Sequence, residues 1–129
     1  MTQINIKKEE ESAINAKEMV MQYIEAINRK DFKSVRRYVS DSVSYVGPVN
    51  EFHKAETYLK YLEHIHLPRL EIKKIFPDAD DVCEFHEVNF DTQYAPLLMC
   101  MWFHVDNGKI SSIRIVFDPR PFLQEQRAR

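Results

Sequence analysis

Several side chains of this 129-residue chain could carry out chemistry, and the first of them lies on a helix face that is otherwise apolar. In the stretch MVMQYIEAINRKDF, Tyr23 sits in the middle of a stripe at helical spacing that is formed by Met19, Val20, Ile24 and Ile27. A buried hydroxyl that is left unpaired costs about 1–3 kcal/mol, so this phenol needs a partner. Either a ligand in a pocket or a neighbouring group of the core can supply it.

Histidines and carboxylates later in the chain could transfer protons. His104 could act as an acid or a base near neutral pH, although a rim histidine that pairs with Ser111 is the plainer interpretation. Glu84 and His86 are two residues apart in a predicted strand, so both side chains can contact the same ligand. An isolated pair of this kind is more often a satisfied polar contact than a site.

The sequence predicts no metal site and no bound cofactor. His64 and His66 lie near Glu63, but residues two apart on a helix point in different directions and cannot converge on one ion. The chain has only two glycines, which excludes a glycine-rich phosphate loop. Cys83 and Cys100 both fall in predicted strands and are expected to be reduced, buried thiols.

Length and composition predict one soluble globular domain over residues 1–129. Hydrophobic residues make up 44% of the chain and charged residues 29%, and the net charge is -2. The basic residues form no dense cluster, so we expect no nucleic-acid partner. The first residues, MTQINIKKEEE, do not resemble a signal peptide, and no apolar run is long enough to span a membrane. We therefore expect a cytoplasmic protein.

The first half of the chain is predicted to be helical. An amphipathic helix covers about residues 10–29, and Asp31 is a suitable N-cap for a short second helix that reaches Val39. A short strand with alternating Val43 and Tyr45 follows. A third helix is predicted to begin at Asn50 as its N-cap and to end before Pro68.

The second half of the chain is predicted to form a sheet, with strands near residues 69–76, 82–90, 95–105 and 110–117. Asn107-Gly108 between two apolar runs predicts a two-residue type I′ hairpin. In an unbroken register Trp102 then faces Ile113, and Cys100 faces Ile115.

That register makes both sides of the hairpin largely apolar. The side opposite Trp102 would carry Met101 and Phe103. Helices can cover only one of the two sides, so we expect a second copy of the chain to cover the other. The predicted partner is thus a second subunit, in a homodimer formed through the sheet around Met101 and Phe103.

The order of elements, three helices and then a long antiparallel sheet, resembles that of the nuclear transport factor 2-like superfamily. The signature Y-x-x-A-(L/I)-N-x-x-D of ketosteroid isomerase and the polyketide-cyclase-like (SnoaL-like) proteins is matched by Tyr23, Ala26, Ile27, Asn28 and Asp31. The resemblance continues at Pro48-Val49 and at NGKISSIRIVF. It implies an α+β fold, a cone-shaped roll in which three N-terminal helices pack on a curved, mainly antiparallel sheet, with a pocket at the open end.

The resemblance also implies roles for individual residues. Tyr23 matches the tyrosine that donates a hydrogen bond to the steroid oxyanion in ketosteroid isomerase. Some polyketide-cyclase-like proteins use an acidic residue on a late strand, which makes Asp118 a catalytic candidate beside His104, although a strand-end carboxylate that pairs with Arg114 or Arg120 is the plainer interpretation. The expected ligand-binding residues of the pocket are Tyr23, Tyr45, Cys100, Trp102, Ile113 and Phe117.

The isomerase machinery itself is incomplete. Counting along the chain from Tyr23 places Gly47 where the isomerase has its carboxylate base, and counting back from the hairpin places Cys100 where it has its carboxylic acid. A glycine cannot abstract a proton, and a buried thiol is a poor donor.

Two functions from different classes therefore stay open. One is a pocket for a small, apolar, oxygenated molecule, with isomerase- or cyclase-like proton transfer if there is catalysis. The other is a non-catalytic dimerisation module or accessory subunit.

Overall fold

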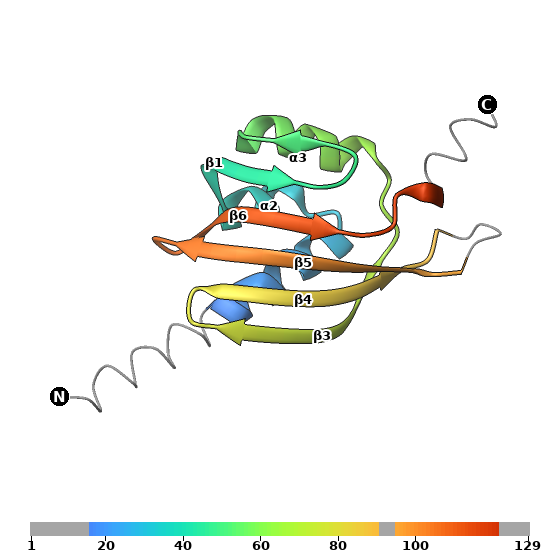
Figure 1. Cartoon of the computed structure of the whole chain (residues 1–129). Helices are drawn as coiled ribbons and strands as arrows, with labels where there is room; N and C mark the ends of the chain where they lie inside the picture. The colour runs from blue at the N-terminus through green and yellow to red at the C-terminus, as the bar shows by residue number, and fades with distance from the viewer. Residues whose placement is uncertain (1–15, 91–94, 122–129) are drawn as a thin grey trace.

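The computed structural model describes residues 16–90 and 95–121, which form helices packed on one curved sheet. Residues 16–28 of the described chain are helical, and the predicted start of this helix near residue 10 lies outside the described residues. The other elements, in chain order, are α2 (Phe32–Tyr38), β1 (Val39–Val46), β2 (Glu51–Phe52), α3 (Ala55–His64), β3 (Leu70–Asp78), β4 (Asp81–Val88), β5 (Leu97–Asp106) and β6 (Lys109–Val116) (Figure 1). The predicted α+β roll of three helices and a mainly antiparallel sheet is confirmed.

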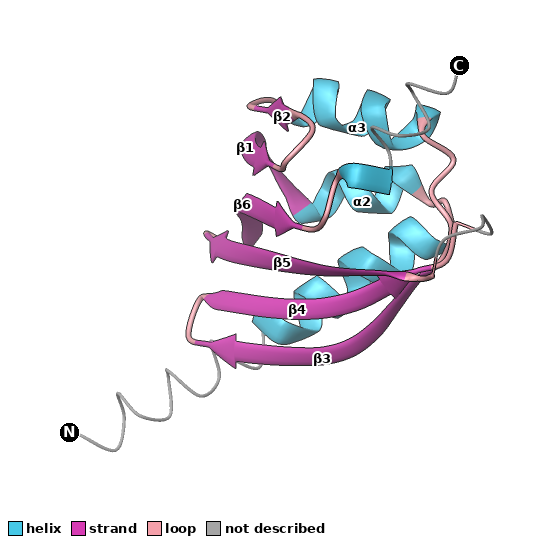
Figure 2. Cartoon of the chain, turned by 45° about the vertical axis from the view of Figure 1, so that its right-hand side comes forward, coloured by secondary structure: helices cyan, strands magenta, loops and turns pink. Residues whose placement is uncertain are grey.

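The described strands form one six-stranded sheet in the order β2-β1-β6-β5-β4-β3. Every neighbouring pair is antiparallel except β1 and β6, which run parallel. The sheet curves, and all three helices lie on the same side of it (Figure 2). We call the side toward the helices the inner face and the opposite side the outer face. The core lies between the inner face and the helices.

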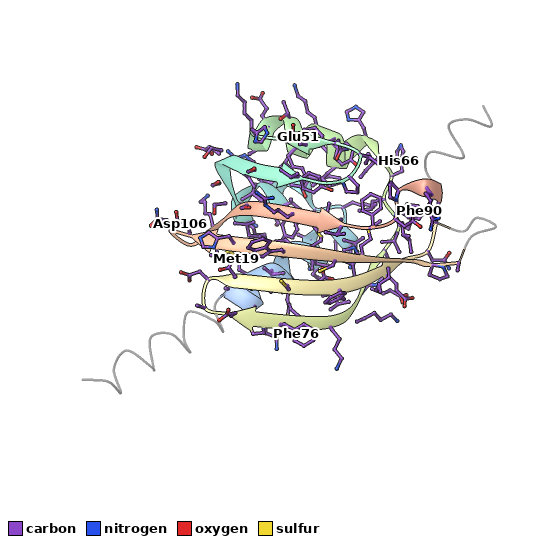
Figure 3. All side chains as sticks on the ribbon, in the orientation of Figure 1. Met19, Glu51, His66, Phe76, Phe90 and Asp106 are labelled. Carbon is purple, nitrogen blue, oxygen red and sulfur yellow. The ribbon has the colours of Figure 1, made fainter. Side chains whose placement is uncertain are left out.

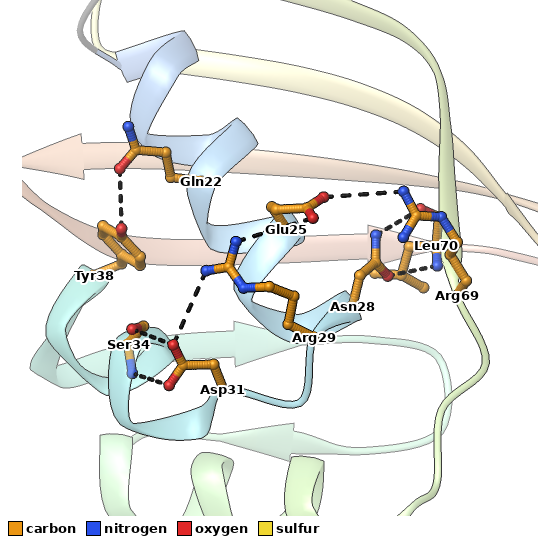
Figure 4. Close-up of polar contacts among 9 residues, drawn as sticks. All are labelled: Gln22, Glu25, Asn28, Arg29, Asp31, Ser34, Tyr38, Arg69 and Leu70. Carbon is orange, nitrogen blue, oxygen red and sulfur yellow. Dashed lines mark hydrogen bonds and ion pairs between the residues drawn. The ribbon is translucent and has the colours of Figure 1, made fainter.

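The polar residues of the signature hold the helices in place. The Asn28 side chain donates from Nδ2 to the Leu70 carbonyl (3.0 Å) and accepts from the Leu70 N–H (2.8 Å), which joins the N-terminal helix to the start of β3 (Figure 4). Asp31 is the N-cap of α2, as predicted, and accepts from the backbone N–H (3.2 Å) and the hydroxyl (2.6 Å) of Ser34. Asn28 and Asp31 thus have structural roles.

The third helix begins later than the sequence predicts. Asn50 is not its N-cap, because the next two residues form β2 and pair with Tyr45 and Val46 of β1. The helix starts only at Ala55. Packing decides this boundary, since the ring of Phe52 lies against that of Tyr45 with 6.0 Å between their centroids. No local pattern in the sequence announces that contact.

The β5–β6 hairpin has the predicted turn but not the predicted register. Asn107 and Gly108 have φ of 53° and 73°, as a type I′ turn requires, and Asp106 pairs with Lys109. A β-bulge then shifts the pairing by one residue, so Trp102 faces Arg114 and Phe103 faces Ile113. The predicted pairs of Trp102 with Ile113 and of Cys100 with Ile115 are wrong.

The shift decides which side chains enter the core. Met101 and Phe103 lie on the inner face with Ile113 and Ile115, and they are 4% and 0% exposed. An interface between two copies through Met101 and Phe103 is therefore wrong, because helices of the same chain already cover these side chains. One extra residue in β6 moves its later side chains to the opposite face.

Replacing Asn28 with alanine should lower the stability of the fold. The change removes both side-chain hydrogen bonds to Leu70 and leaves the backbone groups there without their partner, so we expect a loss of about 1–3 kcal/mol in the free energy of unfolding. Urea unfolding measures this loss. Gln22→Ala, which removes two surface side-chain hydrogen bonds, one from Tyr38 and one to Glu18, is the control and should change stability by less than about 0.5 kcal/mol. Equal effects of the two substitutions would contradict the role given to Asn28.

Candidate functional site

The hydroxyl of Tyr23 meets the hydroxyl of Tyr58 in the centre of the molecule. Tyr23 is 0% and Tyr58 1% exposed, and a short hydrogen bond joins their oxygens. The two residues come from the N-terminal helix and from α3. The edge of the Tyr23 ring also packs on Phe103 of β5, with 5.6 Å between the ring centroids. Each phenol supplies the partner that the other needs.

Further aromatic rings extend from this pair toward β2. Tyr45 stacks on Tyr58 with ring centroids 4.8 Å apart and an interplanar angle of 25°. Phe52 lies 6.0 Å from both rings, and Tyr61 lies 5.0 Å beyond Phe52. We call Tyr23, Tyr58, Tyr45, Phe52 and Tyr61 the aromatic ladder. It runs from the buried core to two half-buried rings.

Burial keeps the inner phenols protonated. Removal from water is the largest cause of the raised pKa of Tyr23, and the charges of Tyr45 and Glu84 add to it, while the hydrogen bond with Tyr58 lowers it in part. Burial also raises the pKa of Tyr58 and of Tyr45 far above the ordinary value of 10.0. At neutral pH these groups are hydrogen-bond donors.

A carboxylate and an imidazole share the same interior. Glu84 and His86 on β4 are 0% and 1% exposed, and Nδ1 of His86 lies 2.8 Å and 2.9 Å from the two carboxylate oxygens of Glu84. On the inner face Glu84 pairs with Met101 and His86 with Met99 of the neighbouring strand. They are the only acidic or basic side chains in the buried core of the described residues. When Nδ1–H donates to Glu84, Nε2 can accept or deliver a proton.

The structure divides the predicted ligand-binding residues between the two faces. Tyr23, Tyr45 and Ile113 lie in the buried interior, and Phe117 is half-buried against the core. Cys100 and Trp102 lie on the outer face, because the pairing partners of Cys100 and Trp102 there are Val116 and Arg114. The prediction that these two residues line one pocket with Tyr23 is therefore wrong.

Both predicted catalytic residues lie outside the core, among polar partners. His104 is on the outer face, where its Nδ1 lies 3.1 Å from Oδ1 of Asp81, and the indole N–H of Trp102 donates to the same oxygen at 2.9 Å. Asp118 follows β6 and accepts two close hydrogen bonds from the Arg120 guanidinium, at 2.9 Å and 2.7 Å. That guanidinium lowers the pKa of Asp118, which makes the carboxylate a weaker base.

The structure also shows the surroundings of Gly47 and Cys100, the two positions that counting along the chain matches to the isomerase carboxylates. A Cβ at Gly47 would lie 2.7 Å from Cγ2 of Ile115, so the space that a base would need is filled. The thiol of Cys100 is on the wrong face, and burial, the first of several causes, raises its pKa. Neither Gly47 nor Cys100 therefore offers the carboxyl group that the resemblance to the isomerase would require at its position.

The residues that sequence reasoning missed carried only a weak signal. Tyr58 repeats the pattern of Tyr23, since it is a phenol within a buried helical stripe that includes Ala55 and Leu62. Glu84 and His86, by contrast, are a candidate pair in the sequence itself, but no local pattern indicates that their strand face is the inner one.

The described residues also line two grooves at the protein surface. One of about 580 Å³ lies between the N-terminal helix and β3, where Met21 and Ile72 are among its lining residues. Another of about 760 Å³ lies between α2 and α3, over Phe32 and Leu59. Within residues 16–90 and 95–121, no three metal-binding side chains converge, and no helix is both long and apolar enough to cross a bilayer.

The fold is that of the nuclear transport factor 2-like proteins. A protein of this class from Cytophaga hutchinsonii, of unknown function, is 23% identical, with a TM-score of 0.77 over 84% of this chain and 94% of that one. A ketosteroid isomerase candidate from Kribbella flavida is 12% identical (TM-score 0.76; 83% of this chain, 80% of that one). An epoxide hydrolase of the LEH-like type from M. tuberculosis is 19% identical (TM-score 0.74; 87% and 89%). At these identities the likeness concerns the fold alone.

The sequence also identifies one family among the proteins with this fold. Residues 20–113 match the SnoaL-like domain, and this match covers most of the chain. The chain therefore belongs to the SnoaL-like domain family. No curated protein matches it in sequence.

The buried phenols should make the fold sensitive to alkali. The pKa of Tyr23 is raised in the folded state, so its contribution to stability is fully present below the unfolded pKa of 10.0 and is lost as the pH rises above that value. Tyr23→Phe removes this titrating hydroxyl. The free energy of unfolding should then fall less steeply between about pH 10 and pH 11, by up to about 1.4 kcal/mol per pH unit. Urea unfolding at several pH values measures it.

Tyr38→Phe is the matched control, because the Tyr38 hydroxyl reaches Gln22 at the surface. The free energy of unfolding of Tyr23→Phe should fall less steeply with alkaline pH than that of Tyr38→Phe. Equal slopes in the two variants would show that Tyr23 does not titrate as a buried phenol.

Proposed function

We propose that this SnoaL-like protein binds a small, uncharged, oxygenated molecule inside its cone and transfers a proton on it. The Tyr23–Tyr58 pair would donate a hydrogen bond to the ligand oxygen. His86 would accept and return the proton through Nε2. Glu84 would hold the imidazole by Nδ1 and stabilise its charged form.

The observation that carries the proposal is the complete burial of the Glu84–His86 pair. Taking a carboxylate and an imidazole out of water costs several kcal/mol, and an apolar pair of similar volume is often as stable or more so. Buried ionisable groups with a specific partner are characteristic of functional sites. Tyr23 lies close enough for the charge of Glu84 to raise its pKa, so donor and base share one interior.

The chemistry of the interior limits the ligand. No lysine or arginine side chain is buried among the described residues, so the interior has no permanent positive charge for a ligand carboxylate or phosphate. A carbonyl oxygen that gains negative charge as a neighbouring carbon loses its proton is suited to two protonated phenols. This favours proton transfer next to a ketone over reactions of charged substrates.

Proton exchange on a model ketone tests the proposal. The α-protons of β-tetralone exchange with deuterium when a base removes them, which NMR detects in D₂O. The protein should accelerate this exchange, and His86→Gln should slow it by about 10²–10⁴-fold, as expected when a positioned base is lost. Tyr23→Phe should weaken ketone binding by up to about tenfold, which is one neutral hydrogen bond.

His104→Gln is the matched control, because it removes an imidazole from the outer face, where Asp81 is its partner. It should leave the exchange rate unchanged. If the unsubstituted protein fails to accelerate exchange, or if His86→Gln retains the full rate, His86 is not the base.

The outer face supports a second candidate function, that of a dimerisation module. Four large apolar side chains are exposed on this face: Phe76 (55%), Leu98 (54%), Trp102 (49%) and Val116 (69%). Phe76 projects from β3 at the edge of the sheet (Figure 3). No helix of the described chain covers this side of the sheet (Figure 1). An uncovered apolar face is suited to a partner, and we propose a second copy of this chain.

Trp102 is the natural centre of such an interface. Its indole is fixed by the hydrogen bond to Asp81 while half of its surface stays exposed, and Arg114 is its neighbour on β6. Rigid tryptophans with nearby arginines dominate the binding energy of many interfaces. The proposed homodimer thus forms through Trp102 and not through Met101 and Phe103.

Trp102→Glu should convert the dimer into a folded monomer. A charge at the centre of the interface would lose its hydration on association, which typically costs more than about 2 kcal/mol and so raises the dissociation constant at least about thirtyfold. Sedimentation velocity gives the mass, and circular dichroism checks the fold. Met21→Glu, an exposed apolar residue on the helical side, is the control and should stay dimeric. A Trp102→Glu variant that sediments as the unsubstituted dimer would place the interface elsewhere.

A further inference from the structure

The interior site is closed in this structure. Tyr23, Tyr58, Glu84 and His86 are each no more than 1% exposed. A ligand can therefore reach the hydroxyl pair only if part of the cover moves. Such openings draw on the least firmly attached elements of a fold.

Among the described residues, the cover is least firmly attached at β2 and the start of α3. β2 has two residues, lies at the edge of the sheet and pairs only with β1. The N-cap of α3, Lys54, makes no side-chain capping hydrogen bond, which weakens the first turn of the helix. By contrast, β3, β4, β5 and β6 are joined by long ladders, and Asn28 ties the N-terminal helix to Leu70 with two hydrogen bonds.

The loop before β2 is also lightly held. It is closed by one backbone hydrogen bond, from the Gly47 N–H to the Asn50 carbonyl (2.9 Å). The side-chain oxygen of Asn50 is buried and finds no hydrogen-bond partner among the described residues. An opening that exposes this oxygen to water would recover part of its lost solvation, which lowers the cost of the movement.

Two rings join β2 to α3 over the site. Phe52 of β2 and Tyr61 of α3 lie 5.0 Å apart, and both are half-buried. Phe52 also packs on Tyr45 and Tyr58, so it separates the inner rings of the aromatic ladder from solvent. β2 lies along the upper edge of the sheet beside α3, where Glu51 is labelled (Figure 3).

From these observations we infer that ligands reach the Tyr23–Tyr58 pair between β2 and α3, and that Phe52 and Tyr61 select them. The inference rests on the proposed function, since it names the route to that same interior site. Separation of the two rings opens the route, and their planar faces favour flat, ring-shaped molecules over branched or charged ones. The residues that control access are thus distinct from those that would transfer the proton.

Amide hydrogen exchange tests the opening without any ligand. In the full chain, the amides of Gly47 and of Tyr58, which donate to Asn50 and Lys54, should exchange at least about tenfold faster than the inner amides of β4 and β5. Their exchange should also be insensitive to low concentrations of urea, as local openings are. If these amides exchange only by global unfolding, together with β4 and β5, the inference is overturned.

Binding kinetics test the role of the two rings. β-Naphthol, a flat phenol whose fluorescence responds to hydrogen bonding, is the probe, and stopped-flow mixing gives both rate constants. Phe52→Ala and Tyr61→Ala should each raise the association and dissociation rate constants by about tenfold, because a larger share of molecules is open. Val49→Ala, which removes an exposed side chain of the same segment, should leave both unchanged.

The outcomes separate the inference from the proposed function. Weaker β-naphthol binding with an unchanged association rate would make Phe52 and Tyr61 walls of the site, and would overturn the gating role. Absence of β-naphthol binding in every variant would count against the proposed function, and the exchange of the Gly47 and Tyr58 amides would then decide whether β2 and α3 open.

Discussion

The hydrogen bond between Tyr23 and Tyr58 joins the N-terminal helix to α3 across an otherwise apolar core. Two phenols that lie in such a core must pair with each other or lose stability, because no water reaches them. This requirement fixes how α3 lies against the N-terminal helix. It also sets the positions of Tyr45 and Phe52, whose rings pack on Tyr58, and so places β1 and β2. One phenol proton is used between the two oxygens, and the other is left as a donor in the interior.

The Glu84–His86 pair distinguishes this interior from an ordinary apolar core. A helix-covered sheet usually presents apolar side chains to its helices, and here Met99, Met101 and Phe103 do so on β5. A carboxylate and an imidazole on the adjacent strand interrupt that pattern at a cost in solvation, which their mutual hydrogen bonds offset in part. Stability alone does not explain why these two groups are buried, whereas the proposed proton transfer would. The proposed ligand binding would require the closed cover to open, and the weak attachment of β2 supports an opening there.

The two faces of the sheet would serve different functions. The inner face carries the carboxylate and the imidazole on β4, and the Tyr23 and Tyr58 phenols are supplied by the helices that cover it. The outer face carries Trp102, Asp81 and His104 in one hydrogen-bonded group within an apolar surface. A proton-transfer site and a dimer interface are compatible in one small domain, because the sheet separates them. The solved structures with this fold include a ketosteroid isomerase candidate and an epoxide hydrolase, so the fold alone does not decide the function and the individual side chains must.

The sequence by itself determined the order of the elements, the Asp31 cap, the hairpin turn at Asn107-Gly108 and the likeness to the SnoaL-like proteins, because each depends on residues close together in the chain. It also pointed to Tyr23 as the phenol that needs a partner. Only the tertiary structure decided that the partner is Tyr58 and that Glu84 and His86 face the core. A single bulge near His104 decided that Trp102 faces outward, since a strand changes face with every residue and one extra residue reverses the assignment. Such a bulge arises from packing between strands, which no local pattern of residues records.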